Sequence, residues 1–207
     1  MTAGALLSAA LLLVVWSQSR GGVTSPGWQT YHDAKYGFSI SYPNGWNADF
    51  RHISVGFLSE PNEKPGQPHD KHTYLVTIGV PAHLTKGTNL SDDTRLDVAT
   101  HSDFACSPTA VLYNPGTVHR LTENGITYSV ASVGEGAAGN FYETTVFVIE
   151  GSKPCLVVEY FIHSTNIGAY DPGTVREFDH AALVADFDRI RRTLVVRPPA
   201  PTPAGPR

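Results

Sequence analysis

Extended, apolar-rich segments that follow one another closely between residues 117 and 163 constrain the fold more than any other feature. Four of them are rich in β-branched and aromatic residues: 117–121, 126–133, 141–149 and 155–163. Only short, turn-forming stretches separate each segment from the next. Because parallel strands need a crossover of about a dozen residues or more, these short connections predict antiparallel pairing.

Two earlier segments extend the predicted sheet. Phe38, Ile40 and Tyr42 alternate with small residues, which is typical of a strand with one buried face. Residues 74–81 have the composition of a second strand. Residues 86–104 are compatible with either a helix or a strand, because an N-cap sequence and an alternating pattern occur there together.

A helix is predicted at the C-terminal end of the folded region. Asp179 is a suitable N-cap, and four apolar residues follow at helical spacing: Leu183, Phe187, Ile190 and Leu194. Arg191 and Arg192 lie in the last turn, where they favour the helix dipole, and Asp188 is assigned to the solvated face. We therefore predict an α+β fold, a single domain with a central antiparallel β-sheet and helices packed on it.

The two ends of the chain differ in composition from the middle. Residues 3–16 are apolar and uncharged, shorter than the roughly 20 residues of a membrane-spanning helix, and fit the core of a secretory signal. We predict that residues 1–19 are a signal peptide or an N-terminal anchor, with a buried helix as the alternative, and that 20–27 are a linker. Residues 197–207 are proline-rich and predicted to be a disordered tail, which leaves 28–196 as the folded domain.

The predicted export and the charge balance together limit the class of partner. We expect a secreted or periplasmic protein that reaches a membrane only through an uncleaved N-terminal segment. The chain has 15 Lys+Arg against 19 Asp+Glu, a net charge of -4, and no basic run. This balance argues against nucleic acid as the partner.

Two cysteines, Cys106 and Cys155, lie in the predicted exported domain. Export permits oxidation, so we predict a disulfide between them. Such a bridge closes a loop of about 50 residues and stabilises the fold by about 4 kcal/mol in the chain-entropy model. Two small buried thiols are the alternative, and the absence of a C-x-x-C motif argues against a redox site.

Residues 36–46 resemble the opening strand and turn of PsbP-like domains, the family of extrinsic photosystem II proteins and many small exported bacterial proteins. The shared pattern is an aromatic-alternating strand, then Pro43, a turn and Trp46. The resemblance implies an α/β/α sandwich with a central antiparallel sheet and helices on both faces. It implies docking functions and no catalytic residues.

Two motifs are candidates for ligand binding. Residues 134–139 match G-x-G-x-x-G, but a strand-like segment follows them where a dinucleotide site needs a helix, so a turn between strands is predicted. His69 and His72 lie in a polar loop and are candidates for a Zn²⁺ or Mn²⁺ site, which needs a third ligand from elsewhere. We expect an ordinary solvated loop here and predict no cofactor.

Acid–base chemistry has one candidate set, Tyr142, Glu159 and His163. Glu159 and His163 lie four residues apart on one strand and so share a face, and Tyr142 lies opposite His163 if residue 150 pairs with residue 155. A hydrogen-bonded polar patch is the competing interpretation. A register slip of one residue moves Tyr142 to the other face.

No motif in the sequence identifies a specific enzymatic reaction. The main hypothesis is an exported cell-envelope protein that binds a protein partner and is not an enzyme. The first alternative is a metal-dependent or acid–base enzyme that uses His163, Glu159 and Tyr142 or the loop of His69 and His72. The second is a carrier of a small apolar ligand, which requires a sizeable apolar cavity.

Overall fold

The computed structural model describes residues 27–56, 71–101 and 105–197. Its helices are α1 (Ala82–Thr85), α2 (Pro108–Val111) and α3 (His180–Arg191), and a 3-10 turn, η1, spans Ile167–Ala169. Its strands are β1 (Trp28–Asp33), β2 (Phe38–Pro43), β3 (Asn47–Asp49), β4 (Ile53–Gly56), β5 (Lys71–Gly79), β6 (Arg95–His101), β7 (His119–Glu123), β8 (Ile126–Ala137), β9 (Asn140–Ile149), β10 (Cys155–Thr165) and β11 (Val195–Val196).

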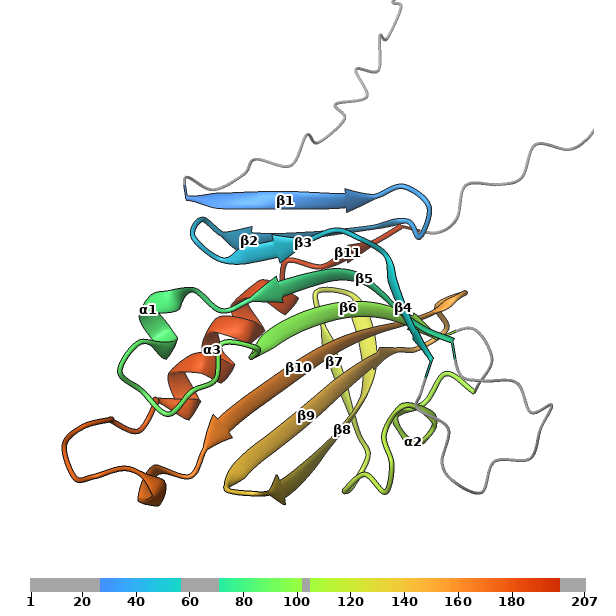
Figure 1. The fold of residues 1–207 in the computed structure, drawn as a ribbon. Helices are drawn as coiled ribbons and strands as arrows, with labels where there is room; N and C mark the ends of the chain where they lie inside the picture. Colours follow the sequence, from blue (N-terminus) through green and yellow to red (C-terminus); the bar gives the residue numbers. More distant parts are fainter. Residues whose placement is uncertain (1–26, 57–70, 102–104, 198–207) are drawn as a thin grey trace, which may run out of the picture.

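The strands form two sheets, and all of their pairings are antiparallel, as the short connections predicted (Figure 1). The larger sheet has the order β3-β5-β6-β10-β9-β8-β7, with β4 also paired to β5, and the smaller one has the order β1-β2-β11. The undecided segment 86–104 contributes β6, which lies between β5 and β10 near the middle of the large sheet. Its position explains its burial pattern, since a central strand is covered on both faces.

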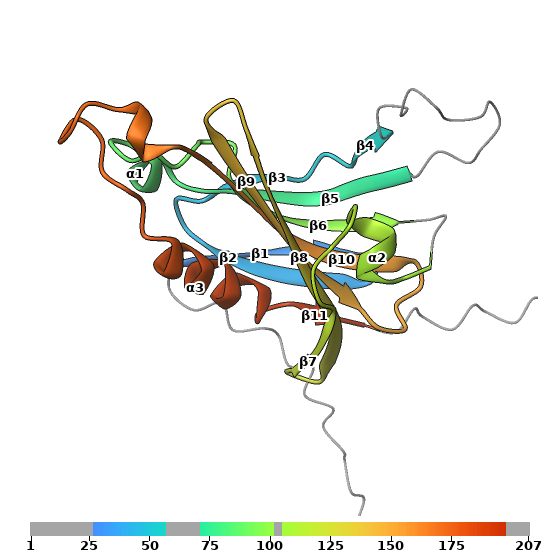
Figure 2. The same ribbon diagram turned by 90° about the horizontal axis from the view of Figure 1, so that it is seen from below.

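The two faces of the large sheet are covered differently (Figures 1 and 2). One face packs against α3 and the small sheet in the main core, where Phe187 of α3 lies 5.1 Å from the ring of Tyr160 on β10. The opposite face carries a second cluster, in which α2 and Leu112 cover Val146, Val148 and neighbouring small residues. Strands dominate the described residues and helices are few. The prediction of a single domain built on antiparallel sheet is therefore confirmed, whereas its helical part is smaller than an α+β sandwich implies.

The C-terminal helix confirms its predicted N-cap and apolar stripe. The Asp179 carboxylate accepts a hydrogen bond from the backbone N–H of Ala182 at 2.9 Å, which satisfies one of the free N–H groups at the start of α3. Leu183, Phe187 and Ile190 are buried against the sheet, whereas Leu194, the predicted fourth member, is buried but lies beyond the end of α3. None of the described helices is long and apolar enough to cross a membrane.

Arg191 lies in the last turn of α3, as predicted, but its side chain faces the sheet, and so does that of Asp188, which was predicted on the solvated face. Arg191 is only 1% exposed and lies 4.3 Å above the ring of Phe147. Its guanidinium donates to the Tyr160 hydroxyl at 2.8 Å and pairs with Glu123 at 2.7 Å and with Asp188 at 3.1 Å. One turn after Phe187, position 191 falls on the buried stripe, so the charge is neutralised there by carboxylates and not left at the solvated helix end.

Candidate functional site

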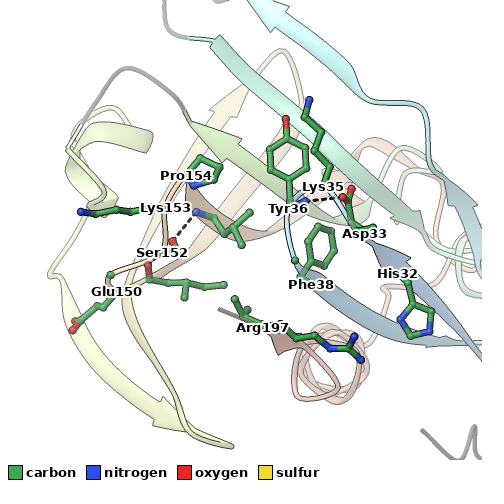
Figure 3. A pocket seen from close by; sticks show the side chains of 16 residues that line it. His32, Asp33, Lys35, Tyr36, Phe38, Glu150, Ser152, Lys153, Pro154 and Arg197 are labelled. Atoms are coloured by element: carbon green, nitrogen blue, oxygen red, sulfur yellow. Dashed lines mark hydrogen bonds between the residues drawn. The ribbon is translucent and has the colours of Figure 1, made fainter. Parts of the chain in front are cut away.

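A pocket of about 970 Å³ opens between the two sheets, at the end of the molecule where two turns meet the exit of β11 (Figure 3). We call it the turn pocket. Its walls come from the β1–β2 turn (residues 32–38), the β9–β10 turn (residues 149–156) and the residues Val196 and Arg197. The apolar part of the wall consists of Tyr36, Phe38, Ile149, Pro154, Leu156 and Val196.

Local hydrogen bonds hold the β1–β2 turn in shape. The buried Asp33 carboxylate accepts from the backbone N–H of Tyr36 at 2.9 Å, and its other oxygen accepts from the Tyr31 hydroxyl at 3.1 Å. Gly37 has a positive φ of 69°, a conformation that favours glycine. Its carbonyl accepts from the backbone N–H of Arg197 at 2.7 Å, so the end of β11 is fastened to this turn.

Hydrogen bonds within the β9–β10 turn and a disulfide to the segment before α2 hold this turn in place. Ser152 donates its hydroxyl to the carbonyl of Ile149 and accepts from the backbone N–H of Leu156, both at 2.9 Å. A disulfide joins Cys155, the first residue of β10, to Cys106 before α2, with their Cα atoms 5.4 Å apart. The turn that lines the pocket is therefore anchored by both hydrogen bonds and a covalent bond.

The charges around the turn pocket are unbalanced. Lys35, Lys153 and Arg197 are exposed, and they form no ion pair with any residue in the described ranges. The two carboxylates of the lining are already engaged: Asp33 as above, and Glu150 with Arg120 and with the Ser129 hydroxyl, which lies at 2.9 Å. The pocket thus combines an apolar interior with a cationic rim.

In Figure 3 the rim cations surround the pocket and do not converge in it. Lys153 and Arg197 point outward in opposite directions, and Lys35 stands beside Tyr36 on a third side. The Lys35 ammonium lies 4.9 Å above the ring of Tyr36. A ligand that meets all three cations must therefore extend across the mouth.

The acid–base candidates lie on the face of the large sheet that points away from α3, and they form two separate groups. His163 pairs with Tyr142 in the predicted register, and their rings stack at 4.4 Å. Glu159 lies four residues away along β10, which corresponds to about 13 Å. Phe161 lies between Glu159 and His163 on the same face, so the structure brings Tyr142 to His163 but not Glu159.

Glu159 belongs to a buried carboxylate cluster that the sequence did not indicate. It is 8% exposed and pairs in register with Asp97 of β6, which is fully buried. Asp97 accepts from Thr77 at 2.5 Å and from Arg95 at 2.9 Å. The register of three neighbouring strands brings these residues together, a relation that spacing along one strand does not reveal.

Burial controls the protonation of this cluster. Loss of solvent, followed by the nearby Asp97 charge, raises the pKa of Glu159 to about 7, against a smaller opposing effect of Arg95. Burial also raises the pKa of Asp97, opposed by Arg95 and Thr77. Tyr74 beside them has its pKa raised to about 12 for the same reason, burial. Glu159 thus changes charge near neutral pH.

His163 is held at both ring nitrogens. Nδ1 lies 2.8 Å from an Asp93 carboxylate oxygen, and Nε2 lies 3.1 Å from the side-chain carbonyl oxygen of Asn140. The amide of Asn140 donates to the Ala138 carbonyl at 3.4 Å, which orients its oxygen toward the ring. These contacts tie the β8–β9 hairpin and the segment before β6 to β10, in line with the hydrogen-bonded polar patch.

The remaining predicted motifs fall as follows. In the glycine motif, residues 134–137 belong to the end of β8, and only Ala138 and Gly139 form the turn into β9, so the predicted turn between strands is confirmed in a shorter form. His69 lies outside the described residues, and of His72 only the backbone, in β5, is described. The turn pocket itself was not predicted, because its residues come from three segments far apart in the chain. In the sequence, residues 36–38 indicated a fold and not a binding site.

Comparison with known proteins finds matches among solved structures only. No family model matches the chain, and neither does any curated protein. Among solved structures, the chain is similar to the solution structure of cyanobacterial PsbP (CyanoP) from Synechocystis sp. PCC 6803, at 18% identity and a TM-score of 0.43. The match covers 86% of this chain and 98% of that chain, and it falls in the family that residues 36–46 resemble.

Proposed function

We propose that this chain is an exported, non-enzymatic domain of the cell envelope that binds a protein partner at the turn pocket. The observation that carries the proposal is the pocket itself, an apolar cleft of about 970 Å³ whose rim cations have no carboxylate partner among the described residues. A concave apolar surface with a few polar groups at its edge is the usual form of a binding site.

The chemistry of the pocket supports binding over catalysis. Its carboxylates are used to hold the turns, and the Ser152 hydroxyl is occupied by two backbone groups. On the other face, His163 is held by Asp93 and Asn140, and Glu159 is buried. Groups engaged in this way serve to shape the fold, whereas a general acid or base needs access to a substrate proton.

The proposed function includes export of the protein and a PsbP-like sandwich architecture. The apolar residues 3–16 favour a secretory signal, and the disulfide between Cys106 and Cys155 suits an oxidising compartment. We interpret the fold as a PsbP-like sandwich in which α3 and α2 lie on opposite faces of the large sheet, a relation supported by the resemblance of residues 36–46.

Site-specific photo-crosslinking of the full chain in the cells that make it tests the proposal. The crosslinker replaces Ala34, an exposed residue of the pocket lining, or Tyr170, an exposed residue at the other end of the domain. We expect a discrete protein adduct in the envelope fraction from Ala34 and none from Tyr170. No adduct at Ala34, or the same adduct at both positions, would overturn the proposal.

A further inference from the structure

We infer that the turn pocket recognises an acidic, extended polypeptide segment that inserts an aromatic or branched apolar side chain. This inference rests on the proposed function and names the chemistry of the partner. It is carried by two properties of the pocket that are independent of each other: the size of its apolar interior and the placement of its charges.

The interior has room for more than one side chain. Pockets of about 300–1,000 Å³ bury most of a drug-sized molecule, and the turn pocket, at about 970 Å³, lies at the upper end of this range. Phe38, Ile149 and Leu156 form its floor, and all three are buried. A large apolar side chain inserted here gains contact with the floor, while its neighbours in the segment fill the space beside it.

The charges favour a segment with several carboxylates over a single anionic head group. Lys35, Lys153 and Arg197 belong to three different parts of the chain, and their side chains point in different directions (Figure 3). A fatty acid or other amphiphile brings one head group, which pairs with one side of the rim. A polypeptide crossing the mouth brings carboxylates to more than one side.

The rim also selects against a basic partner. The lining carboxylates, Asp33 and Glu150, already accept hydrogen bonds from Tyr36, Arg120 and other groups, so a lysine-rich segment finds no acceptor there and meets like charges. Rim charges chiefly increase the association rate and the salt dependence of binding, and the apolar anchor supplies most of the affinity.

Defined probes test this inference on the oxidised protein by fluorescence anisotropy at about 0.05 M and about 0.5 M salt. The main probe is a labelled acidic peptide with a central phenylalanine. Its controls are the same peptide with alanine at the centre, a version with lysines for the acidic residues, and dodecanoate as a competing amphiphile. The variant K35Q/K153Q removes one cation from each turn. The control K86Q/R176Q removes two exposed cations from the segments that follow α1 and precede α3, which lie at the opposite end of the domain (Figure 1).

The inference expects saturable binding of the phenylalanine peptide that weakens at high salt. Replacing the anchor with alanine weakens binding about tenfold or more, and K35Q/K153Q weakens it about three- to tenfold while K86Q/R176Q leaves it unchanged. Equal binding of the lysine peptide, equal effects of the two double variants, displacement by dodecanoate without peptide binding, or no binding at all would each overturn it. Because the crosslink at Ala34 does not depend on these probes, an adduct there without peptide binding refutes the ligand class and leaves the proposed function standing.

Discussion

Replacing Glu159 with glutamine is predicted to stabilise the protein at neutral and alkaline pH and to have little effect in acid. The pKa of Glu159 is raised from its ordinary value of 4.5 to about 7, chiefly by burial and then by Asp97. In the unfolded chain the same carboxyl loses its proton at the ordinary value. Between these two pKa values the folded protein holds more protons than the unfolded chain, so stability falls as the pH rises.

The magnitude follows from the shift. Each pKa unit corresponds to about 1.4 kcal/mol, so charging Glu159 in the folded state costs about 3 kcal/mol above neutral pH and nothing below pH 4 or so. Glutamine at this position imitates the protonated carboxyl and removes that cost. The advantage of E159Q over the natural chain should therefore grow by about 3 kcal/mol between acid and alkaline pH.

Urea unfolding of both proteins at about pH 4, pH 6 and pH 8, with the disulfide intact, measures this difference. Titrating groups away from this cluster contribute equally to both proteins and cancel, whereas the interaction of Glu159 with Asp97 is part of the measured difference. The matched control is E135Q, which changes an exposed glutamate of β8 and should give a constant difference across the range. The reasoning about burial is refuted if the E159Q curve runs parallel to that of the natural chain, or if E159Q is the less stable protein at pH 8.

Three further substitutions test how the fold is held. Replacing Arg191 with methionine should lower the free energy of unfolding by about 1–3 kcal/mol, because the buried Tyr160 hydroxyl and the partly exposed carboxylates of Glu123 and Asp188 lose a charged hydrogen-bond donor. Lysine should rescue only part of this loss in urea titrations. Gly37→Ala should lower the melting temperature more than Gly125→Ala. Both glycines have a positive φ, but a Cβ at Gly37 lies 3.1 Å from the carbonyl oxygen of Arg197, whereas a Cβ at Gly125 meets open space. Equal decreases in melting temperature would contradict this. Replacing both Cys106 and Cys155 with alanine should lower stability by about 4 kcal/mol, and a reductant should then have no additional effect on the melting temperature.

The sequence predicted those features that depend on neighbouring residues. The alternation of Phe38, Ile40 and Tyr42, the short turns between strands and the stripe on α3 each follow from local periodicity, and the structure confirms them. The pairing of His163 with Tyr142 also followed, because a short turn sets the register of a hairpin. Segment 86–104 remained undecided, since its local signals conflicted and only its place in the middle of the sheet made it a strand.

The candidate sites depended on relations that no local pattern contains. Asp97 reaches Glu159 only because β6 and β10, far apart in the sequence, are neighbours in the sheet. Arg191 became a core residue because the aromatic face of β9 and β10 and two carboxylates happen to surround that end of α3. The turn pocket exists because two turns and the end of β11 meet in space. Periodicity tells which side chains of one element share a face, whereas the packing of elements decides which faces meet, and the pocket and the buried charges arise from that second step.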